Sequence, residues 1–138
     1  MPEEKHVLSI LVDNEPGVLS RITGLFSGRG YNIESLSVAE TMEPRMSRIT
    51  MITRGDVSIL EQIKKQLHKL INVVTVQDLT DKEFVQRELA LIKVNAKPEF
   101  RAEILRIVDI FRAKVVDVGH EHYTLELAAT EDKLTAIM

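Results

Sequence analysis

Along the first eighty positions, the spacing of apolar residues switches several times between the period of two of a strand and the period of 3.6 of a helix. His6–Val12 is a short apolar run rich in Val, Ile and Leu, which predicts a buried β-strand. After a turn at 13–17, apolar residues recur every three or four positions, as on one face of an amphipathic helix. These residues are Val18, Leu19, Ile22, Leu25 and Phe26. Gly28 and Gly30 are expected to supply the left-handed positions that end this helix.

Two more strands, a second helix and a final strand are predicted downstream. Asn32–Glu40 and Ser47–Thr53 have the pattern of hairpin strands joined by a Pro-containing turn. Ser58, with Glu61 three residues later, predicts a capping box at the start of a helix. The apolar face of this helix is formed by Leu60, Ile63, Leu67 and Leu70. Val73–Leu79 then predicts a strand, so the order is that of the split βαβ, or ferredoxin-like, sandwich. Right-handed crossovers would place both helices on one face of a four-stranded antiparallel sheet.

A polar stretch at Thr80–Glu83 separates two halves of similar pattern. Glu88–Asn95 predicts a strand, and Pro98 is expected to be the first residue of a helix. The apolar stripe of that helix is formed by Phe100, Ile104, Ile107, Val108 and Phe111. Two further strands are predicted at Val115–Val118 and Tyr123–Ala128. The predicted class is therefore α+β, with two tandem ferredoxin-like domains at 1–80 and 81–138.

A weak internal repeat supports this division. Arg21-Ile22-x-x-Leu25-Phe26 aligns without a gap on Arg106-Ile107-x-x-Ile110-Phe111. The second copy is incomplete, because Thr130–Met138 is expected to form only the first turns of its second helix. We expect the chain to be a fragment, because a sheet that lacks a strand leaves apolar surface uncovered.

Composition excludes several classes of function. The chain has 138 residues and no cysteine, so it has neither a disulfide scaffold nor a thiolate nucleophile, and a cytoplasmic location is expected. A formal charge of −3 argues against non-specific nucleic-acid binding. No apolar run approaches the roughly 20 residues of a membrane-spanning helix, and the polar N-terminus is not a secretory signal.

The turn before the first helix carries the most informative chemistry. Pro16 has no backbone donor, and Gly17 has no Cβ, so a ligand could approach the helix start closely. The amides of Gly17, Val18 and Leu19 would form a small anion site, and Asn14 offers a donor and an acceptor. Local chemistry alone favours a simpler interpretation, in which these residues form only a turn that leads into a helix.

The same residues resemble the ACT domain, and more narrowly the small, regulatory subunit of acetohydroxyacid synthase (acetolactate synthase). The resemblance is carried by residues 14–22 (Asn-Glu-Pro-Gly-Val-Leu-Ser-Arg-Ile) and 29–36 (Arg-Gly-Tyr-Asn-Ile-Glu-Ser-Leu). The Asn-x-x-Gly turn alone marks only an ACT domain, whereas the run at 29–36 is far more specific to this subunit. The resemblance implies a non-catalytic homodimer that activates a large catalytic subunit and mediates feedback inhibition by a branched-chain amino acid, usually valine. Thiamine diphosphate, magnesium and FAD are expected only in that partner.

Transferred by motif, the resemblance implies an effector site between two protomers. One protomer would provide Asn14 and the Gly17–Leu19 segment, namely Gly17, Val18 and Leu19, and the other would provide Asn32 and Ile33. Pro16 departs from members that carry a small polar residue before the glycine. The second repeat has Pro98-Glu99-Phe100 instead of Pro-Gly, so no matching site is expected there.

Other interpretations have less support. An ACT module that regulates a different enzyme is the main alternative. An RNA-binding domain of the same topology would need aromatic residues on its third strand, and Arg48–Thr53 has none. A small acylphosphatase-type enzyme would need an Arg-lined phosphate loop, whereas this turn carries Asp13 and Glu15. His120-x-His122 lacks a third metal ligand, and Lys64-Lys65 is expected to lie on a solvated helix face.

Overall fold

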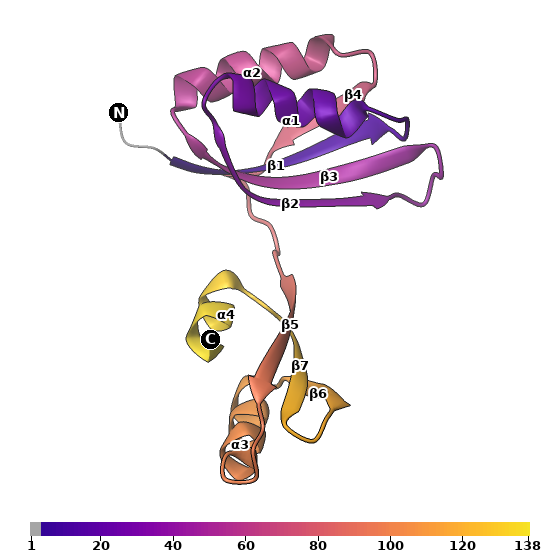
Figure 1. Cartoon of the computed structure of the whole chain (residues 1–138). Coiled ribbons are helices and arrows are strands. Elements are labelled where there is room, and N and C mark those ends of the chain that lie inside the picture. Colours follow the sequence, from indigo (N-terminus) through magenta and orange to yellow (C-terminus); the bar gives the residue numbers. More distant parts are fainter. Residues whose placement is uncertain (1–3) are drawn as a thin grey trace. The chain divides into compact units, whose positions relative to one another are not determined.

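The computed structural model describes residues 4–138, which divide into two compact units, one ending at Phe84 and the other running from Val85 to Met138. The first unit contains strands β1 (Glu4–Asp13), β2 (Asn32–Glu40), β3 (Met46–Gly55) and β4 (Val73–Asp78), with helices α1 (Val18–Gly28) and α2 (Val57–Lys69). The four strands are antiparallel neighbours in the order β2-β3-β1-β4. Both helices lie on one face of this sheet (Figure 1). The expected ferredoxin-like sandwich is confirmed.

The core of the first unit lies between this sheet and its two helices. Alternate residues of β1 face the helices, so Leu8, Ile10 and Val12 are buried against side chains of both helices. The apolar stripe of α1 supplies Val18, Ile22 and Phe26, and that of α2 supplies Leu60, Ile63 and Leu67. The spacing of apolar residues in the sequence therefore identifies the buried faces of both helices.

The start of α2 differs from the sequence prediction. The capping residue is Asp56, whose carboxylate accepts a hydrogen bond of 2.9 Å from the amide of Ser58. The predicted capping box with Ser58 as the cap is therefore wrong. An aspartate two residues earlier takes the role because its carboxylate reaches the first free amides of the helix.

The end of α1 is also corrected. Gly30 has a φ of +69°, as expected, but Gly28 is the last helical residue and has no positive φ. The amide of Tyr31 donates to the carbonyl of Phe26 at 2.9 Å, so the helix is closed around Gly30, two residues after Gly28.

Three turns meet at one end of the first sheet. The amide of Asp13 donates to the carbonyl of Asn72 at 2.8 Å, and the amide of Asn14 donates to the carbonyl of Arg45 at 2.7 Å. These bonds join the β1–α1 turn to the α2–β4 turn on one side and to the β2–β3 turn on the other.

The second unit repeats the first five elements. It contains β5 (Glu88–Asn95), α3 (Arg101–Phe111), β6 (Lys114–Val118), β7 (His122–Ala129) and α4 (Glu131–Ile137). The sheet order β5-β7-β6 corresponds to β1-β3-β2 of the first unit. Pro98 is not the first residue of α3, which begins three residues later. The amide of Phe100 donates to the carbonyl of Lys97 at 2.8 Å, so the proline lies in a turn before the helix.

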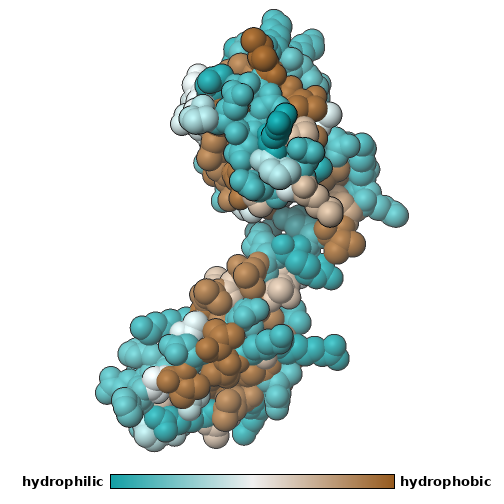
Figure 2. Space-filling view, turned by 90° about the vertical axis from the view of Figure 1, so that its right-hand side faces the viewer, coloured by the Kyte–Doolittle hydropathy of each residue, from teal (hydrophilic) through white to brown (hydrophobic). Residues whose placement is uncertain are grey.

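The second unit buries less apolar surface than the first. Its buried cluster is small, formed by Leu127, Ala129 and Leu134, while Leu89 and Leu91 on β5 are each 67% exposed. Figure 2 shows apolar side chains gathered on its surface. A hollow of about 70 Å³ remains on its helical side, lined only by apolar residues: Ile92, Val94, Ile104, Ile107, Leu125 and Ile137. Over residues 4–138, no helix has the length and apolarity required to cross a membrane.

Candidate functional site

Asn14 is held by two hydrogen bonds to the β2–β3 hairpin. Besides its backbone bond to Arg45, its side-chain Nδ2 donates to Oε1 of Glu40 at 3.1 Å. A carboxylate only accepts hydrogen bonds, so the NH₂ group of Asn14 must face Glu40. The amide oxygen of Asn14 then remains for another donor. Both side chains are solvent-exposed, which leaves this oxygen accessible to a small molecule.

Gly17 forms the N-terminus of α1 in a conformation that favours glycine. Its φ is +83°, and no side chain among the described residues caps the helix. The amides of Gly17 and Leu19 find no acceptor in residues 4–138. The amide of Val18 is less free than predicted, because it donates to the carbonyl of Glu15 at 3.4 Å. Two unpaired amides at a helix start attract an anion the size of a carboxylate.

The two residues after Gly17 have different roles. The side chain of Val18 is 4% exposed and belongs to the core, so only its backbone can face a ligand. The side chain of Leu19 is 39% exposed and offers apolar surface at the first turn of the helix. Sequence patterns alone do not separate these roles, because both residues fit the same apolar stripe.

Asn32 and Ile33 lie at the opposite end of β2 from Asn14. Asn32 pairs with Arg54 of β3, whereas Glu40, the neighbour of Asn14, pairs with Ser47. Eight residue steps along a strand correspond to about 26 Å. The structure therefore does not bring Asn32 and Ile33 to Asn14 within one chain.

The strand that carries these residues is an exposed edge. Within residues 4–138, β2 pairs only with β3, and its register places Leu36 opposite Met51 and Val38 opposite Ile49, on the helix-covered face. Leu36 and Val38 are nevertheless 38% and 43% exposed. An edge strand with exposed apolar side chains and unpaired backbone groups is a template for a further strand.

A bulge shapes the start of this edge strand. The register between β2 and β3 shifts between Ile33 and Ser35, and Glu34 accepts from Nε of Arg54 at 2.6 Å. A bulge re-aims the side chains next to it. It therefore sets the direction of Ile33 relative to the rest of the strand.

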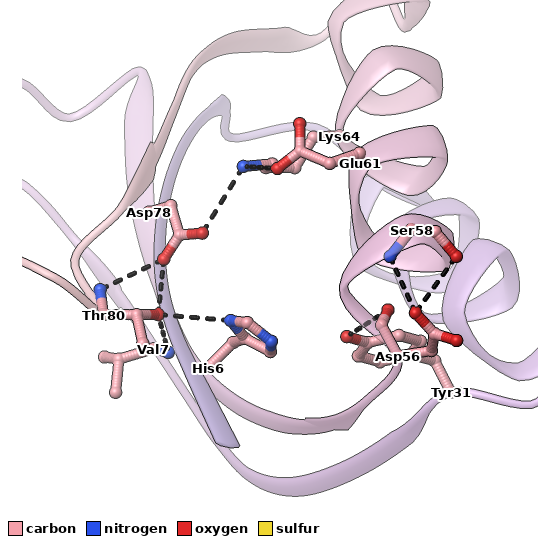
Figure 3. A network of polar contacts seen from close by, with 9 residues as sticks. All are labelled: His6, Val7, Tyr31, Asp56, Ser58, Glu61, Lys64, Asp78 and Thr80. Atoms are coloured by element: carbon pink, nitrogen blue, oxygen red, sulfur yellow. Dashed lines mark hydrogen bonds and ion pairs between the residues drawn. The ribbon is translucent and has the colours of Figure 1, made fainter. Parts of the chain in front are cut away.

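A second polar cluster lies at the other end of β1 and has a structural role (Figure 3). The hydroxyl and amide of Thr80 both donate to Asp78, and Thr80 Oγ1 accepts from the amide of Val7 at 3.2 Å. His6 Nδ1 lies 3.4 Å from the same oxygen. Lys64 of α2 contacts Asp78 at 3.4 Å and Glu61 at 2.7 Å. The cluster ties the residues after β4 to β1 and α2.

The charges in this cluster shift one another's ionisation. Partial burial alone raises the pKa of Asp78, but the hydrogen bonds from Thr80 and the charge of Lys64 outweigh it and hold that pKa below its usual range. Burial alone lowers the pKa of Lys64. The hydrogen bond to Glu61 and the nearby carboxylates outweigh that effect and raise the pKa.

The described residues contain no group of three or more His, Asp or Glu side chains arranged for a metal ion. His120 and His122 lie in the β6–β7 hairpin, where Gly119 donates to the carbonyl of His122 at 2.8 Å. The hairpin adds no further ligand to this pair.

Two charged residues near Asn14 and Gly17 were not predicted. Glu40 contacts Asn14 from the end of β2, and the guanidinium of Arg21 lies 3.8 Å from the position that a Cβ on Gly17 would occupy. Arg21 could have been identified from the sequence, because it follows Gly17 by four residues and so lies over it on a helix. No sequence pattern could have identified Glu40, because its contact with Asn14 depends on sheet register.

The fold and the Asn14–Gly17 turn define a class. A four-stranded sheet with two helices on one face and an uncapped helix after the Asn-x-x-Gly turn makes the first unit an ACT domain, and residues 8–75 match the model of the AHAS small subunit-like ACT domain. Residues 87–138 match the model described as the small subunit of acetolactate synthase. The chain belongs to the family of acetolactate synthase small subunits.

Similar proteins support this assignment over nearly the whole chain. The acetolactate synthase isozyme 3 small subunit of Salmonella typhimurium is 50% identical over 97% of this chain and 82% of its own length. The crystal structure of the small subunit from Thermotoga maritima has a TM-score of 0.88 and 40% identity, covering 97% of this chain and 84% of that one. The ACT domain of GTP pyrophosphokinase from Chlorobium tepidum, 19% identical with a TM-score of 0.50 over 56% of this chain and 99% of its own, shares the fold.

Proposed function

We propose that this chain is a non-catalytic regulatory subunit that activates the large subunit of acetolactate synthase and transmits feedback inhibition by a branched-chain amino acid, with valine as the first candidate. Membership of the small-subunit family supports a catalytic large subunit as the partner. The reaction and its cofactors, including thiamine diphosphate, would then belong to that partner, and both subunits would act in the cytoplasm.

The observation that carries the proposal is the uncapped N-terminus of α1 beside Asn14, at one end of an exposed edge strand. An amino acid needs an anion site, a polar partner and an apolar wall. The Gly17 and Leu19 amides, the oxygen of Asn14 and the side chain of Leu19 are suited to these roles. One chain supplies only half of an enclosed pocket.

A second copy would complete the pocket. Antiparallel pairing of two β2 strands around Leu36 sets residue 32 of one copy opposite residue 40 of the other, since their numbers are equally far from 36. Asn32 and Ile33 of the second copy would then lie beside Glu40 and Asn14. A ligand bound across two copies stabilises the pair, and a coupling of about 1–3 kcal/mol is enough for useful control.

The main alternative is an ACT module that senses an amino acid for a different enzyme. Reconstitution with the large subunit of acetolactate synthase separates the two. We expect activation of the large subunit and inhibition of the complex by valine. Absence of activation, with valine still bound by this chain, would favour the alternative.

Calorimetry with valine tests the site itself. Asn14→Ala removes the amide oxygen, and Gly17→Asn fills the space at the helix start with a residue that tolerates positive φ. We expect Asn14→Ala to weaken binding about tenfold, the loss expected for one polar contact, and Gly17→Asn to weaken it to a similar degree because its side chain obstructs the helix start. Gly24→Asn, a glycine of the same helix with open space around its Cβ position, is the matched control. Unchanged binding in both site variants would exclude this location.

A further inference from the structure

Glu40 is placed to orient Asn14 and to add charge beside it. Its Oε1 accepts from Nδ2 of Asn14 at 3.1 Å, which fixes the otherwise ambiguous orientation of the Asn14 amide. The Asn14 oxygen and the Glu40 carboxylate are then neighbouring acceptors. Two acceptors, one of them charged, favour a cationic donor such as an ammonium group.

The hairpin holds Glu40 in place. The residue that follows it, Thr41, donates its amide to the carbonyl of Met46 at 2.9 Å, and its hydroxyl contacts the carbonyls of Glu43 and Met46 at 3.0 and 3.2 Å. Asn14 is anchored to the same hairpin through its backbone bond to Arg45. The backbone segments that carry the two side chains are therefore both held by the hairpin.

Arg21 adds the opposite charge at Gly17. Its Nη2 lies 3.8 Å from the Cβ position of Gly17, so the guanidinium folds back towards the start of α1. Within residues 4–138, the observed ion pairs do not include Arg21. A guanidinium binds a carboxylate through two parallel hydrogen bonds, and here it would reinforce the Gly17 and Leu19 amides.

The two charges match the ends of a free amino acid. Gly17 follows Asn14 by three residues, so the positive and the negative groups border the same turn. The ammonium and carboxylate of an α-amino acid are attached to the same carbon, so one small ligand presents both charges to this turn. A ligand that carries only one of the two charges does not satisfy both groups.

We propose that Glu40 and Arg21 are the charged residues that make this site specific for a zwitterion, with Glu40 positioning Asn14 and facing the ammonium while Arg21 faces the carboxylate. This inference rests on the proposed function, because it concerns the same site. It adds the requirement that both charged groups of the effector are free.

Calorimetry on the full chain tests the two residues. Glu40→Gln keeps an oxygen that accepts from Asn14 but removes the charge, whereas Glu40→Ala removes both. We expect Glu40→Gln to weaken valine binding about tenfold and Glu40→Ala to weaken it further, because charge-assisted hydrogen bonds are the stronger ones. Arg21→Gln should cause a loss similar to that of Glu40→Gln. The controls are Glu43→Gln in the same hairpin and Arg29→Gln at the end of the same helix.

Two analogues of valine separate the charges. Valinamide keeps the ammonium and lacks the carboxylate, so its weak binding should respond to Glu40→Gln and not to Arg21→Gln. 3-Methylbutanoate keeps the carboxylate and lacks the ammonium, so the opposite pattern is expected. Circular dichroism and light scattering on each variant confirm that fold and assembly are unchanged.

The outcomes distinguish this inference from the proposed function. Valine binding that is within twofold of the unmodified chain in both Glu40→Gln and Arg21→Gln overturns the zwitterion assignment and leaves the site at Asn14 intact. If the unmodified chain binds none of valine, leucine and isoleucine, the proposed function fails and the assignment fails with it.

Discussion

At the scale of single residues, the contact between Gly55 and Tyr31 shows how closely the first unit is packed. Tyr31 is 5% exposed, its ring meets that of Phe26 edge-on at 6.0 Å between centroids, and its hydroxyl donates to the carbonyl of Asp56 at 3.2 Å. A Cβ on Gly55 would lie 2.5 Å from the Tyr31 ring. The ring cannot move without losing these contacts, so any side chain at the last residue of β3 would overpack this site.

We therefore expect Gly55→Ala to lower the free energy of unfolding by about 1–3 kcal/mol, the usual cost of overpacking. Urea unfolding followed by circular dichroism measures this change. Gly28→Ala is the matched control, because its Cβ meets nothing within 4 Å and lies in a helix. A Gly55→Ala variant as stable as the unmodified chain would contradict the observed position of the Tyr31 ring.

Asp78 makes the stability of the first unit depend on pH. Its folded-state pKa lies below the unfolded value of about 3.9, so its contribution is present above that pH and is lost as pH falls through the folded pKa. We expect Asp78→Asn to cost roughly 1 kcal/mol at pH 7, and the difference from the unmodified chain to shrink below pH 4. Urea unfolding at pH 7 and pH 3 measures both values. The exposed Asp81→Asn is the control, and a difference that persists at pH 3 would exclude this linkage.

At the scale of elements, the pattern of apolar and polar residues predicts the strands well. β2 and β5 have the predicted bounds, although almost all side chains of β2 are exposed. Helix starts were predicted less well. Asp56 and Ser58 are both good caps, and Pro98 fits a first helical turn, so local preference alone does not identify which residue begins the helix.

The site residues also divide into those that the local sequence identifies and those that only the packed structure identifies. Asn14 and Gly17 lie in one short turn, and their chemistry is apparent from neighbouring letters of the sequence. The contact of Asn14 with Glu40 spans 26 positions and depends on the register of β1, β3 and β2. The burial of Val18 and the exposure of Leu19 depend on where the sheet lies under α1. Such relations require the packed structure, because no local pattern encodes them.

At the scale of the whole molecule, the exposed edge of β2 predicts how two copies associate. A charge at Leu36 would be buried at the centre of a β2–β2 pair, where an unpaired charge is strongly unfavourable. We expect Leu36→Lys to weaken dimerisation at least about tenfold, as measured by analytical ultracentrifugation. Val74→Lys changes a side chain of similar exposure on β4, the opposite edge strand, and is the control. Equal dissociation in both variants would argue against pairing through β2.

Three turns are joined by backbone hydrogen bonds at one end of the first sheet. Binding of a ligand at one of these turns could therefore be measured with a probe attached to another. A displacement of the β1–α1 turn would act on the β2–β3 turn through the Asn14–Arg45 bond, and Met42 in that turn is fully exposed. The chain contains no cysteine. Met42→Cys therefore creates a unique attachment point for a fluorescent dye, which would report binding from a residue outside the pocket.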